Sequence, residues 1–439
     1  MNGLEKRKPR FVIVTRDFSG MGFALMIKNA GYDVVMAYKF DLKKQKENLD
    51  SFKLAGKNMI DRIELDKINW REYRDAYIFF DQNHWHEVGD ALKKDGFKVW
   101  GGTSLCYKME HDRNFGVALA KKGGIDTPPT FEFDSLKDGL DFLDKNPETA
   151  YVFKPNDQVE SWDTFVPDSD KAQSANEELY AYMQALPDQA GGFILQEKKY
   201  GVETNFEVWV NNGKPIFAFC DLECKKKLDN DYGCLVGGAQ DVAFTLDLEA
   251  KGIRETCLAL LTKNSVFRDY TGFLDMNIIV SEKENYFLEF CARTGYPAHP
   301  TLFTALAKRP FPEILIDMLE GRGDLFESFK YGFAAGITLY TDKPRKGMPL
   351  YIGDQAEKAF YHYDSYKRDG MLLTAGSEPE VGVITGHGYT IKSAAEDALK
   401  NKDRINFPNR SSRTDLDKNC YPSAPQGRYD ALRAMGYLD

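Results

Sequence analysis

Apolar runs of strand length alternate with amphipathic stretches through the first part of the chain. The pattern predicts four strands, at FVIVT, DVVMAY, AYIFF and FKVWGG (11–15, 33–38, 76–80 and 97–102). Between the first two, FALMIKNAG predicts an amphipathic helix that ends at Gly31, and HWHEVGDALKKDG predicts a second helix between the last two. Because strands that alternate with helices build parallel sheets, we expect an open α/β lobe here.

The next part of the chain predicts a smaller lobe. A helical stretch at 107–124 is followed by IDTPPTFEF, whose two prolines mark a chain reversal. Beyond it, the helical stretches SLKDGLDFLDKN and ANEELYAYMQAL alternate with the strand-like runs YVFKP and GGFILQEKKY. This order predicts a β-α-β-α-β unit.

Two hairpins follow the small lobe. TNFEVWVNNGKPIFAFCDLE alternates at period two on both sides of Asn212-Gly213, a pair typical of two-residue hairpin turns. TGFLDMNIIVSEKENYFLEFCAR (271–293) predicts a second hairpin. From about residue 330, short strand-like runs and a helical stretch at SAAEDALKNK indicate a small α+β cap.

The size of the chain agrees with several lobes. At 439 residues it exceeds what one hydrophobic core usually supports, and its 43% apolar and 28% charged residues are typical of globular proteins. We predict an α/β and α+β protein made of an N-terminal parallel-sheet lobe, a linker helix with a small lid lobe, a larger lobe and a C-terminal cap (1–106, 107–192, 193–328 and 329–439).

Charge and cysteine usage narrow the class of protein. The net charge of -9 argues against a broad surface that tracks nucleic-acid phosphates. The seven cysteines lack C-x-x-C spacing and an odd count fits no complete disulfide framework, so we expect reduced thiols in the cytoplasm. FVIVT is too short for a signal peptide or a membrane span, and we expect no membrane association.

An unusual strand face is the first chemical signal. Period two in YFLEFCAR places Phe287, Glu289, Cys291 and Arg293 on one face. If the hairpin turns tightly near Glu282, Asp275 lies directly across from Glu289. Opposed carboxylates repel unless a hard cation lies between them, and Mg²⁺ takes one or two protein carboxylates together with phosphates and water. The pattern alone leaves two readings open, a metal site and a buried ion pair with Arg293.

Two basic features could serve phosphate, although each also fits an ordinary surface. Lys154 ends the apolar run YVFKP, which would bury its stem and present the ammonium group. Lys225, Lys226 and Lys227 form a compact basic run inside the chain. Taken alone, the run is typical of a solvated face.

Five motifs follow one another along the chain: YVFKP, LQEKKYGVE (195–203), ECKKKLDNDYGCLVGG (223–238), FLEFCARTGYP (287–297) and SSRTDLD (411–417). Their order resembles the ATP-grasp superfamily, most closely the glycinamide ribonucleotide synthetase (phosphoribosylamine-glycine ligase) family, over nearly the whole chain. The resemblance implies an ATP-grasp fold and an enzyme that uses ATP with Mg²⁺ or Mn²⁺ to join a small carboxylate, an amino acid, to an amine.

The resemblance also implies roles for single residues. For ATP they are Arg113 and Lys154 on the phosphates, Gln196, Glu197 and Lys198 at the adenine hinge, and Glu203 near the ribose. For the metal they are Asp275 and Glu289; for catalysis they are Arg293 with the basic pair Lys225 and Lys226. Such a site transfers the γ-phosphoryl group to the carboxylate, and an amine then attacks the acyl phosphate.

The chain departs from the family at three places. The loop after the phosphate lysine, 156–165, contains no glycine, so ATP would be covered by side chains such as Ser161 and Thr164, or held less well. Cys291 replaces an asparagine beside the metal, and a thiol suits Mg²⁺ poorly. Tyr296 and Ala298 replace an acidic pair of the substrate pockets, so we expect altered substrates.

The N-terminal turn remains open between two readings. Ser19 and Gly20 belong to a loop that could face substrate or could simply begin a helix, and they lack the complete G-x-G-x-x-G of a dinucleotide site. Asn83, His84 and His86 follow a strand on the same side and could contact substrate. We include Ser19, Gly20 and Tyr296 as candidate substrate residues.

Two other functions compete with the ligase. The glycine-free loop and Cys291 would fit a nucleotide-binding protein that kept the fold and lost the chemistry. A dehydrogenase would need a full dinucleotide fingerprint, which is not present. The sequence does not disclose the acceptor, the donor or the oligomeric state.

Overall fold

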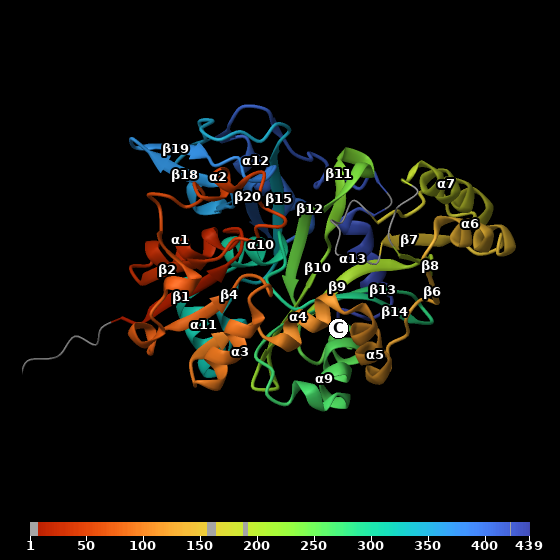
Figure 1. Cartoon of the computed structure of the whole chain (residues 1–439), viewed down its shortest axis with the longest axis horizontal. Helices are drawn as coiled ribbons and strands as arrows, with labels where there is room; N and C mark the ends of the chain where they lie inside the picture. Colours follow the sequence, from red (N-terminus) through yellow and green to blue (C-terminus); the bar gives the residue numbers. More distant parts are fainter. Residues whose placement is uncertain (1–7, 156–163, 188–191, 422) are drawn as a thin grey trace, which may run out of the picture.

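The computed structural model describes residues 8–155, 164–187, 192–421 and 423–439. Its first lobe contains a parallel sheet in the order β3-β2-β1-β4-β5 (Figure 1), as the alternation of strands and helices predicted. The strands are β1 (Arg10–Thr15), β2 (Asp33–Tyr38), β3 (Asp61–Glu64), β4 (Tyr77–Phe80) and β5 (Lys98–Trp100). The strand β3, whose DRIE sequence has no apolar run, was not predicted.

Helices cover both faces of this sheet because the strand residues alternate. Phe11 and Ile13 pack with α1 (Met21–Asn29) in one core, whereas Val12 and Val14 pack with α3 (His86–Lys94) in another. A short helix, α2 (Leu49–Phe52), and the helix α4 (Ser104–His111) complete the lobe. The loops after β1 and β4 therefore meet at the carboxyl edge of the sheet.

The small lobe has the predicted β-α-β-α-β order. After α5 (Arg113–Gly123) it comprises β6 (Thr130–Phe133), α6 (Leu136–Lys145), β7 (Tyr151–Pro155), α7 (Ala172–Ala185) and β8 (Phe193–Glu197). The three strands pair antiparallel in the order β6-β8-β7. Phe153, Phe193 and Met183 are central to its own small core.

A long antiparallel sheet passes through the centre of the molecule in the order β14-β13-β9-β10-β12-β15-β20-β17 (Figure 1). Its first half contains β9 (Val202–Asn211), β10 (Lys214–Asp221), β11 (Cys224–Leu228), β12 (Tyr232–Thr245), β13 (Gly272–Val280) and β14 (Asn285–Cys291). Both predicted hairpins are confirmed, β9–β10 and β13–β14. Asn212 and Gly213 adopt positive φ values of 48° and 73°, as the primed hairpin turn requires.

The chain after residue 330 extends the same sheet. It adds β15 (Phe333–Thr341), β17 (Phe360–His362), β20 (Glu380–Gly388) and β22 (Arg410–Ser411), with β16 (Tyr351–Ile352), β18 (Ser365–Arg368), β19 (Met371–Thr374) and β21 (Ile405–Asn406) in small ribbons. The predicted tail helix is α12 (Ile391–Lys402), and α13 (Pro425–Ala434) follows it. The three boundaries between the four predicted lobes stay a prediction, and the long sheet is continuous across the last of them.

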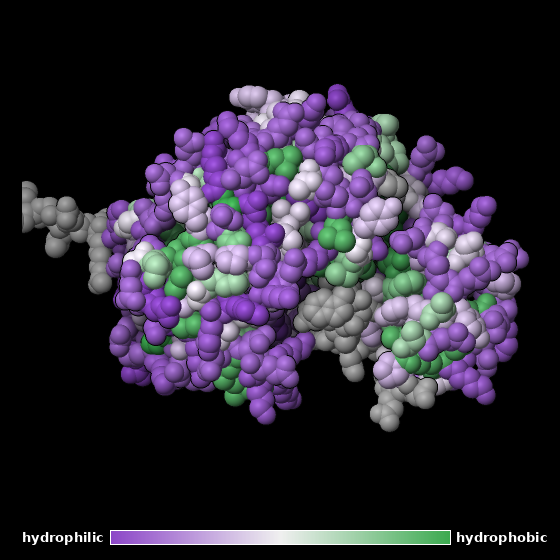
Figure 2. Space-filling view, turned by 90° about the horizontal axis from the view of Figure 1, so that it is seen from above, coloured by the Kyte–Doolittle hydropathy of each residue, from purple (hydrophilic) through white to green (hydrophobic). Residues whose placement is uncertain are grey.

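Helices also cover both faces of the long sheet. Trp209, Phe217 and Phe273 pack under α10 (Ala298–Ala305) and α11 (Phe311–Glu320), whereas Phe206 and Val208 pack toward α8 (Lys251–Ile253) and α9 (Ala259–Lys263). Hydrophilic side chains predominate on the face shown in Figure 2. In the described ranges, no helix is both long enough and apolar enough to cross a bilayer.

Candidate active site

The face of the long sheet under α10 changes from apolar to acidic along its strands. On β9 the inward residues are Trp209, then Glu207, then Asn205, and on β13 they are Phe273, Asp275 and Asn277. The strand register places Glu207 opposite Asp275. Polar side chains of neighbouring strands therefore form rows across the sheet.

Several carboxylates in these rows are buried. Glu207, Asp221, Asp241 and Asp275 are at most 4% exposed. Burial, with the nearby acids Glu207 and Glu223, raises the pKa of Asp275 well above its ordinary value. Burial and the Asp241 carboxylate do the same to the pKa of Asp221. The site thus concentrates negative charge where only a cation could keep these groups ionised.

The predicted pairing of Asp275 with Glu289 is wrong by two residues. Glu289 lies opposite Asn277, and Asp275 lies opposite Cys291. A bulge leaves Leu288 as the extra residue of β14, because Phe287 pairs with Ile278 while Glu289 pairs with the adjacent Asn277. The position of a bulge cannot be read from the period of the sequence.

The bulge also changes one face prediction. Phe287 packs against Phe290 in the core, with ring centroids 4.5 Å apart, and does not share a face with Glu289. Asp275 and Glu289 are diagonal neighbours on the side of the sheet that faces α10. Their environments differ, since Asp275 is buried and Glu289 is exposed.

Lys225 contacts acidic and polar side chains of these strands. Its Nζ donates to Glu203 Oε1 at 2.8 Å and to Asn277 Oδ1 at 3.4 Å. Although burial opposes the charged form, Glu203, Glu223 and Glu289 together raise the pKa of Lys225. In return, Lys225 lowers the pKa of Glu203. Lys225 therefore stays protonated inside an acidic cluster.

Glu289 is the common neighbour of three cations from separate elements. Burial lowers the pKa of Lys154 on β7 to about 8, and Glu289 offsets part of that shift while Arg113 and Lys225 add to it. Burial likewise lowers the pKa of Arg113, at the start of α5, and Glu289 opposes the change. The small lobe, α5 and β11 thus direct positive charge to one end of β14.

Other predicted residues have partners of their own. Lys226 Nζ lies 3.8 Å from Asp168 Oδ1 and does not join Lys225. Lys198 Nζ donates to the carbonyls of Pro167 and Ser169, each at 2.9 Å, and so fixes a loop of the small lobe. Two further hinge contacts are Gln196 Nε2 to Thr130 Oγ1 at 3.1 Å and Lys199 Nζ to Glu197 Oε2 at 2.8 Å.

Arg293 is held by a residue that the sequence did not single out. Its Nε donates to Glu110 Oε1 at 2.9 Å, and Asn83 Nδ2 donates to Glu110 Oε2 at 2.8 Å. Burial would raise the pKa of Glu110, but Arg293 and His111 outweigh it and lower that pKa. Arg293 therefore pairs with Glu110 of α4, and not with Asp275 or Glu289 as the alternative reading of the sequence had it.

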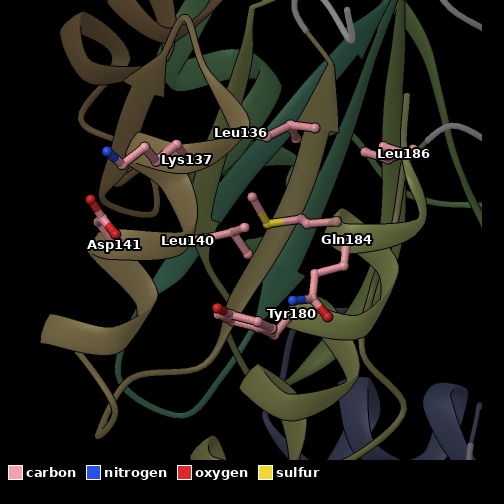
Figure 3. A pocket seen from close by; sticks show the side chains of 8 residues that line it. Leu136, Lys137, Leu140, Asp141, Tyr180, Gln184 and Leu186 are labelled. Carbon is pink, nitrogen blue, oxygen red and sulfur yellow. The ribbon is translucent and has the colours of Figure 1, made fainter. Parts of the chain in front are cut away.

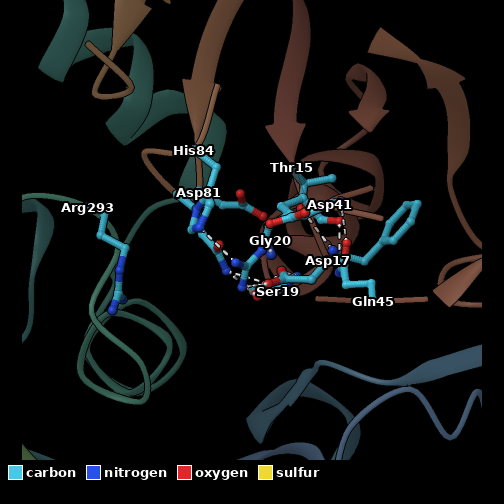
Figure 4. Close-up of polar contacts among 12 residues, drawn as sticks. Thr15, Asp17, Ser19, Gly20, Asp41, Gln45, Asp81, His84 and Arg293 are labelled. Atoms are coloured by element: carbon cyan, nitrogen blue, oxygen red, sulfur yellow. Dashed lines mark hydrogen bonds and ion pairs between the residues drawn. The ribbon is translucent and has the colours of Figure 1, made fainter. Parts of the chain in front are cut away.

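The N-terminal loop is the second polar centre of the molecule, shown in Figure 4. The backbone N–H of Ser19 donates to Asp17 Oδ1 at 3.0 Å, and that of Gly20 donates to Asp81 Oδ2 at 2.7 Å. His84 Nε2 lies 2.7 Å from Arg16, on the same side of the loop.

His86 lies apart from this loop. It hydrogen-bonds Ser104 Oγ at 2.9 Å and packs on the ring of Tyr107. The predicted contact of His86 with a substrate is therefore the least supported of the three residues after β4.

A metal ion at this site would need ligands from other molecules in addition to those from the protein. Among the residues that the structure describes, no group of three or more His, Cys, Asp or Glu side chains is arranged to hold a metal. Asp275 Oδ1 is buried and lacks a hydrogen-bond partner, which fits a carboxylate that awaits a cation. Burial raises the pKa of Cys291 well above its ordinary value, so its thiol stays protonated.

A hollow of the small lobe lies away from this centre. Figure 3 shows a hollow of the small lobe between α6 and α7, lined by Leu136, Leu140, Tyr180 and Leu186 among others, and none of the predicted site residues lines it. The predicted cover of ATP by Ser161 falls outside the described residues, whereas Thr164 is partly buried at the end of that loop.

Comparison with known proteins gives this geometry a family context. No protein-family model matches the chain. The chain is 22% identical over 405 residues to the phosphoribosylamine–glycine ligase of Lactococcus lactis, which covers 87% of this chain and 95% of that protein.

Solved structures share the fold of this chain. The phosphoribosylamine–glycine ligase of Thermotoga maritima superposes with a TM-score of 0.68 at 18% identity, covering 92% of this chain and 99% of that chain. The biotin carboxylase domain of the Hydrogenobacter thermophilus 2-oxoglutarate carboxylase, solved with MgADP and bicarbonate, gives 0.60 at 13% identity, covering 92% and 91%. The chain is thus similar in sequence, at low identity, to the phosphoribosylamine–glycine ligases and has the ATP-grasp fold.

Proposed function

We propose that this chain is an ATP-dependent carboxylate–amine ligase that works through an acyl phosphate and releases ADP and phosphate. The observation that carries the proposal is the meeting of Arg113, Lys154 and Lys225 around Glu289, beside the buried Asp275. Cations that converge from separate lobes suit a triphosphate, because each can neutralise a different phosphate oxygen. The names of the relatives support the same reaction class.

The cations have different tasks in this mechanism. Lys154, on the small lobe, and Arg113 bind phosphate oxygens from the side of β7 and α5. Lys225 is fixed by Glu203 and Asn277, so its ammonium group is already oriented when the nucleotide arrives. Gln196, Glu197 and Lys198 on the β8 edge are proposed to meet the adenine ring, and Glu203 is proposed to lie near the ribose.

Mg²⁺, or Mn²⁺, fits the acidic rows of the sheet. Asp275 and Glu289 would hold the ion, since Asp275 Oδ1 has no other partner and Glu289 is exposed. When bound, the ion would neutralise phosphate charge. Because only two protein carboxylates are offered, phosphates and water would complete its ligands.

The reaction has two steps, each of which forms one bond and breaks another. The donor carboxylate, proposed to be that of an amino acid, attacks the γ-phosphorus, and the bond to the β-γ bridging oxygen breaks to release ADP. The acceptor amine then attacks the acyl carbon, phosphate leaves, and the amine loses a proton. Arg293, held against Glu110, is proposed to stabilise negative charge that develops at the acyl group.

Trapping the intermediate tests this proposal. With ATP, Mg²⁺, hydroxylamine and a panel of amino acids, we expect one amino acid to give a hydroxamate and equal amounts of ADP and phosphate. Glu289→Gln should lower the rate by more than about a hundredfold, because a metal ligand contributes several kcal/mol. Glu282→Gln, at the exposed turn of the same hairpin, is the matched control and should retain full activity.

Two outcomes separate the alternatives. ATP binding without ADP release for any donor and acceptor would favour a nucleotide-binding protein that has lost its chemistry. Normal activity of Glu289→Gln would contradict the proposed metal site.

A cytoplasmic location is also proposed, supported by the seven cysteines, all of which are free thiols.

A further inference from the structure

The helix α1 begins at the carboxyl edge of the first-lobe sheet, and backbone N–H groups before its first turn are already hydrogen-bonded to carboxylates. In α/β folds, the free backbone N–H groups at such an edge commonly bind a phosphate. Here those of Ser19 and Gly20 already donate to Asp17 and Asp81 (Figure 4). The two carboxylates come from the loops after β1 and β4 of the same sheet.

Both carboxylates are held firmly. Asp17 also accepts from Gln82 Nε2 at 2.7 Å and pairs with Arg16 at 3.1 Å. Asp81 is fully buried, and a Cβ added at Gly20 would lie 2.7 Å from its Oδ2, so the carboxylate is packed directly on the loop. A phosphate could reach these amides only by displacing both carboxyl groups, and the ionised Asp17 would then repel it.

One oxygen of this centre still lacks a partner. Asp81 Oδ1 is buried without a hydrogen bond; the Thr15 hydroxyl is near enough to lower the pKa of Asp81 but does not reach hydrogen-bond geometry with that oxygen. Burial and the neighbouring Asp17 nevertheless raise the pKa of Asp81 to about 8. A buried carboxyl oxygen of this kind requires a donor, and a cation bound there would favour the ionised form of Asp81, which burial and Asp17 disfavour.

Tyrosine rings lie beside the N-terminal loop, from the turn before α10 and from β17. Tyr361 Oη donates to the carbonyl of Ser19 at 3.1 Å, and the ring of Tyr296 packs against Tyr363 with centroids 5.4 Å apart. The ring of Tyr296 lies 6.4 Å from that of Tyr361 between centroids, and burial, Tyr361 and Asp81 raise the pKa of Tyr296. Rings beside a carboxylate provide a π surface for a cation.

The same turn leads to the proposed reaction centre. Gly295 precedes Tyr296, and a Cβ added at Gly295 would lie 3.9 Å from Asp275 Oδ2. A ligand held by Asp81 and Tyr296 would therefore lie close to Asp275, one of the two proposed metal ligands. This continuity connects the N-terminal loop to the ligase chemistry proposed above.

We propose that the acceptor of this chain is a cationic amine without a phosphate group, bound by Asp81 and the tyrosine rings at the N-terminal loop. The inference rests on the proposed ligase function and assigns the class of its acceptor. It also assigns Asp17 and Asp81 as the residues that exclude phosphate-bearing acceptors, the class to which phosphoribosylamine belongs.

A matched pair of ligands tests the proposal directly. Ethanolamine and phosphoethanolamine share an ammonium group and differ by one phosphate. Titration calorimetry of the full chain, with ADP and Mg²⁺ present, should show saturable binding of ethanolamine. Asp81→Asn should weaken that binding by about tenfold or more, as expected for loss of a charge-assisted hydrogen bond. Asp33→Asn, exposed at the opposite edge of the same sheet, should leave it unchanged.

Several results would overturn the inference. They are absence of saturable ethanolamine binding, equal ethanolamine affinity in the parent and Asp81→Asn, and displacement of ethanolamine by phosphoethanolamine with a lower dissociation constant. This titration measures binding and not ADP release, so its result does not depend on whether the chain catalyses the ligase reaction. A chain that binds ethanolamine through Asp81 but makes no hydroxamate would contradict only the proposed chemistry.

Discussion

Replacing Lys225 by methionine removes one charge while keeping most of the buried stem. Its contact with Glu203 is a charge-assisted hydrogen bond of 2.8 Å, the kind that contributes about 1.5–3 kcal/mol. The side chains are 28% and 45% exposed, so solvent screening reduces this to about 1–2 kcal/mol. We therefore expect Lys225→Met to lower the free energy of unfolding by that amount near neutral pH.

The effect should depend on pH with a definite sign. The pKa of Glu203 is lowered, so its share of the stability is present above its ordinary value of 4.5 and is lost as pH falls through the lowered pKa. The pKa of Lys225 is raised from 10.5, so its share persists through neutral pH and is lost only at higher pH. Glu223, with a pKa of about 8, becomes still harder to ionise without the lysine.

Urea denaturation followed by fluorescence at pH about 3 and pH about 8.5 measures this difference, since the first value lies well below the ordinary pKa of Glu203 and the second lies above the pKa of Glu223. Lys227→Met is the matched control: the residue is on the same strand, but its partner Asp342 is exposed and 3.4 Å away. We expect the control to change stability by less than about 0.5 kcal/mol. Equal losses for the two variants, or a loss from Lys225→Met that is the same at both pH values, would refute the electrostatic account.

Three further predictions concern other parts of the site. Lys154→Ala should weaken ATP binding by about tenfold or more, measured by calorimetry, while Lys145→Ala on the exposed end of α6 should not; equal affinities would remove Lys154 from the phosphate site. Asp275→Asn should raise the thermal midpoint of the metal-free protein at pH about 8, because ionising a carboxylate of raised pKa becomes costlier as pH rises, and should abolish turnover; a lower midpoint would contradict this. Arg413→Met should destabilise the chain by about 3 kcal/mol in urea titrations, because the fully buried guanidinium pairs with Asp231 and Asp415; a loss below about 1 kcal/mol would show that these pairs are dispensable.

The periodicity of the sequence predicted which strands form better than it predicted the register between paired strands. Both hairpins were predicted because alternation and the Asn212-Gly213 turn are local signals. The register of β13 against β14 was not, because the bulge at Leu288 shifts the pairing by an amount that only packing determines. Asp275 therefore faces Cys291, two residues from the expected partner.

The polar partners of the site were harder to predict than its cations. Glu110 reaches Arg293 across 183 residues of sequence, and nothing in its own helix marks it. Glu207 and Asp221 did carry a usable signal, since each occupies an inward position of an otherwise apolar alternation. A carboxylate at such a position becomes informative once the strands on either side are paired.

The central claim is that Asp275 and Glu289 hold a divalent ion against a triphosphate bound by Lys154. A crystal structure with Mn²⁺ and a non-hydrolysable ATP analogue, recorded at a wavelength that reveals manganese, tests it most directly. We predict one manganese peak within about 2.5 Å of both carboxylates, with the nucleotide phosphates between β7 and β14. A nucleotide bound elsewhere, or a manganese ion that contacts neither carboxylate, would contradict the account.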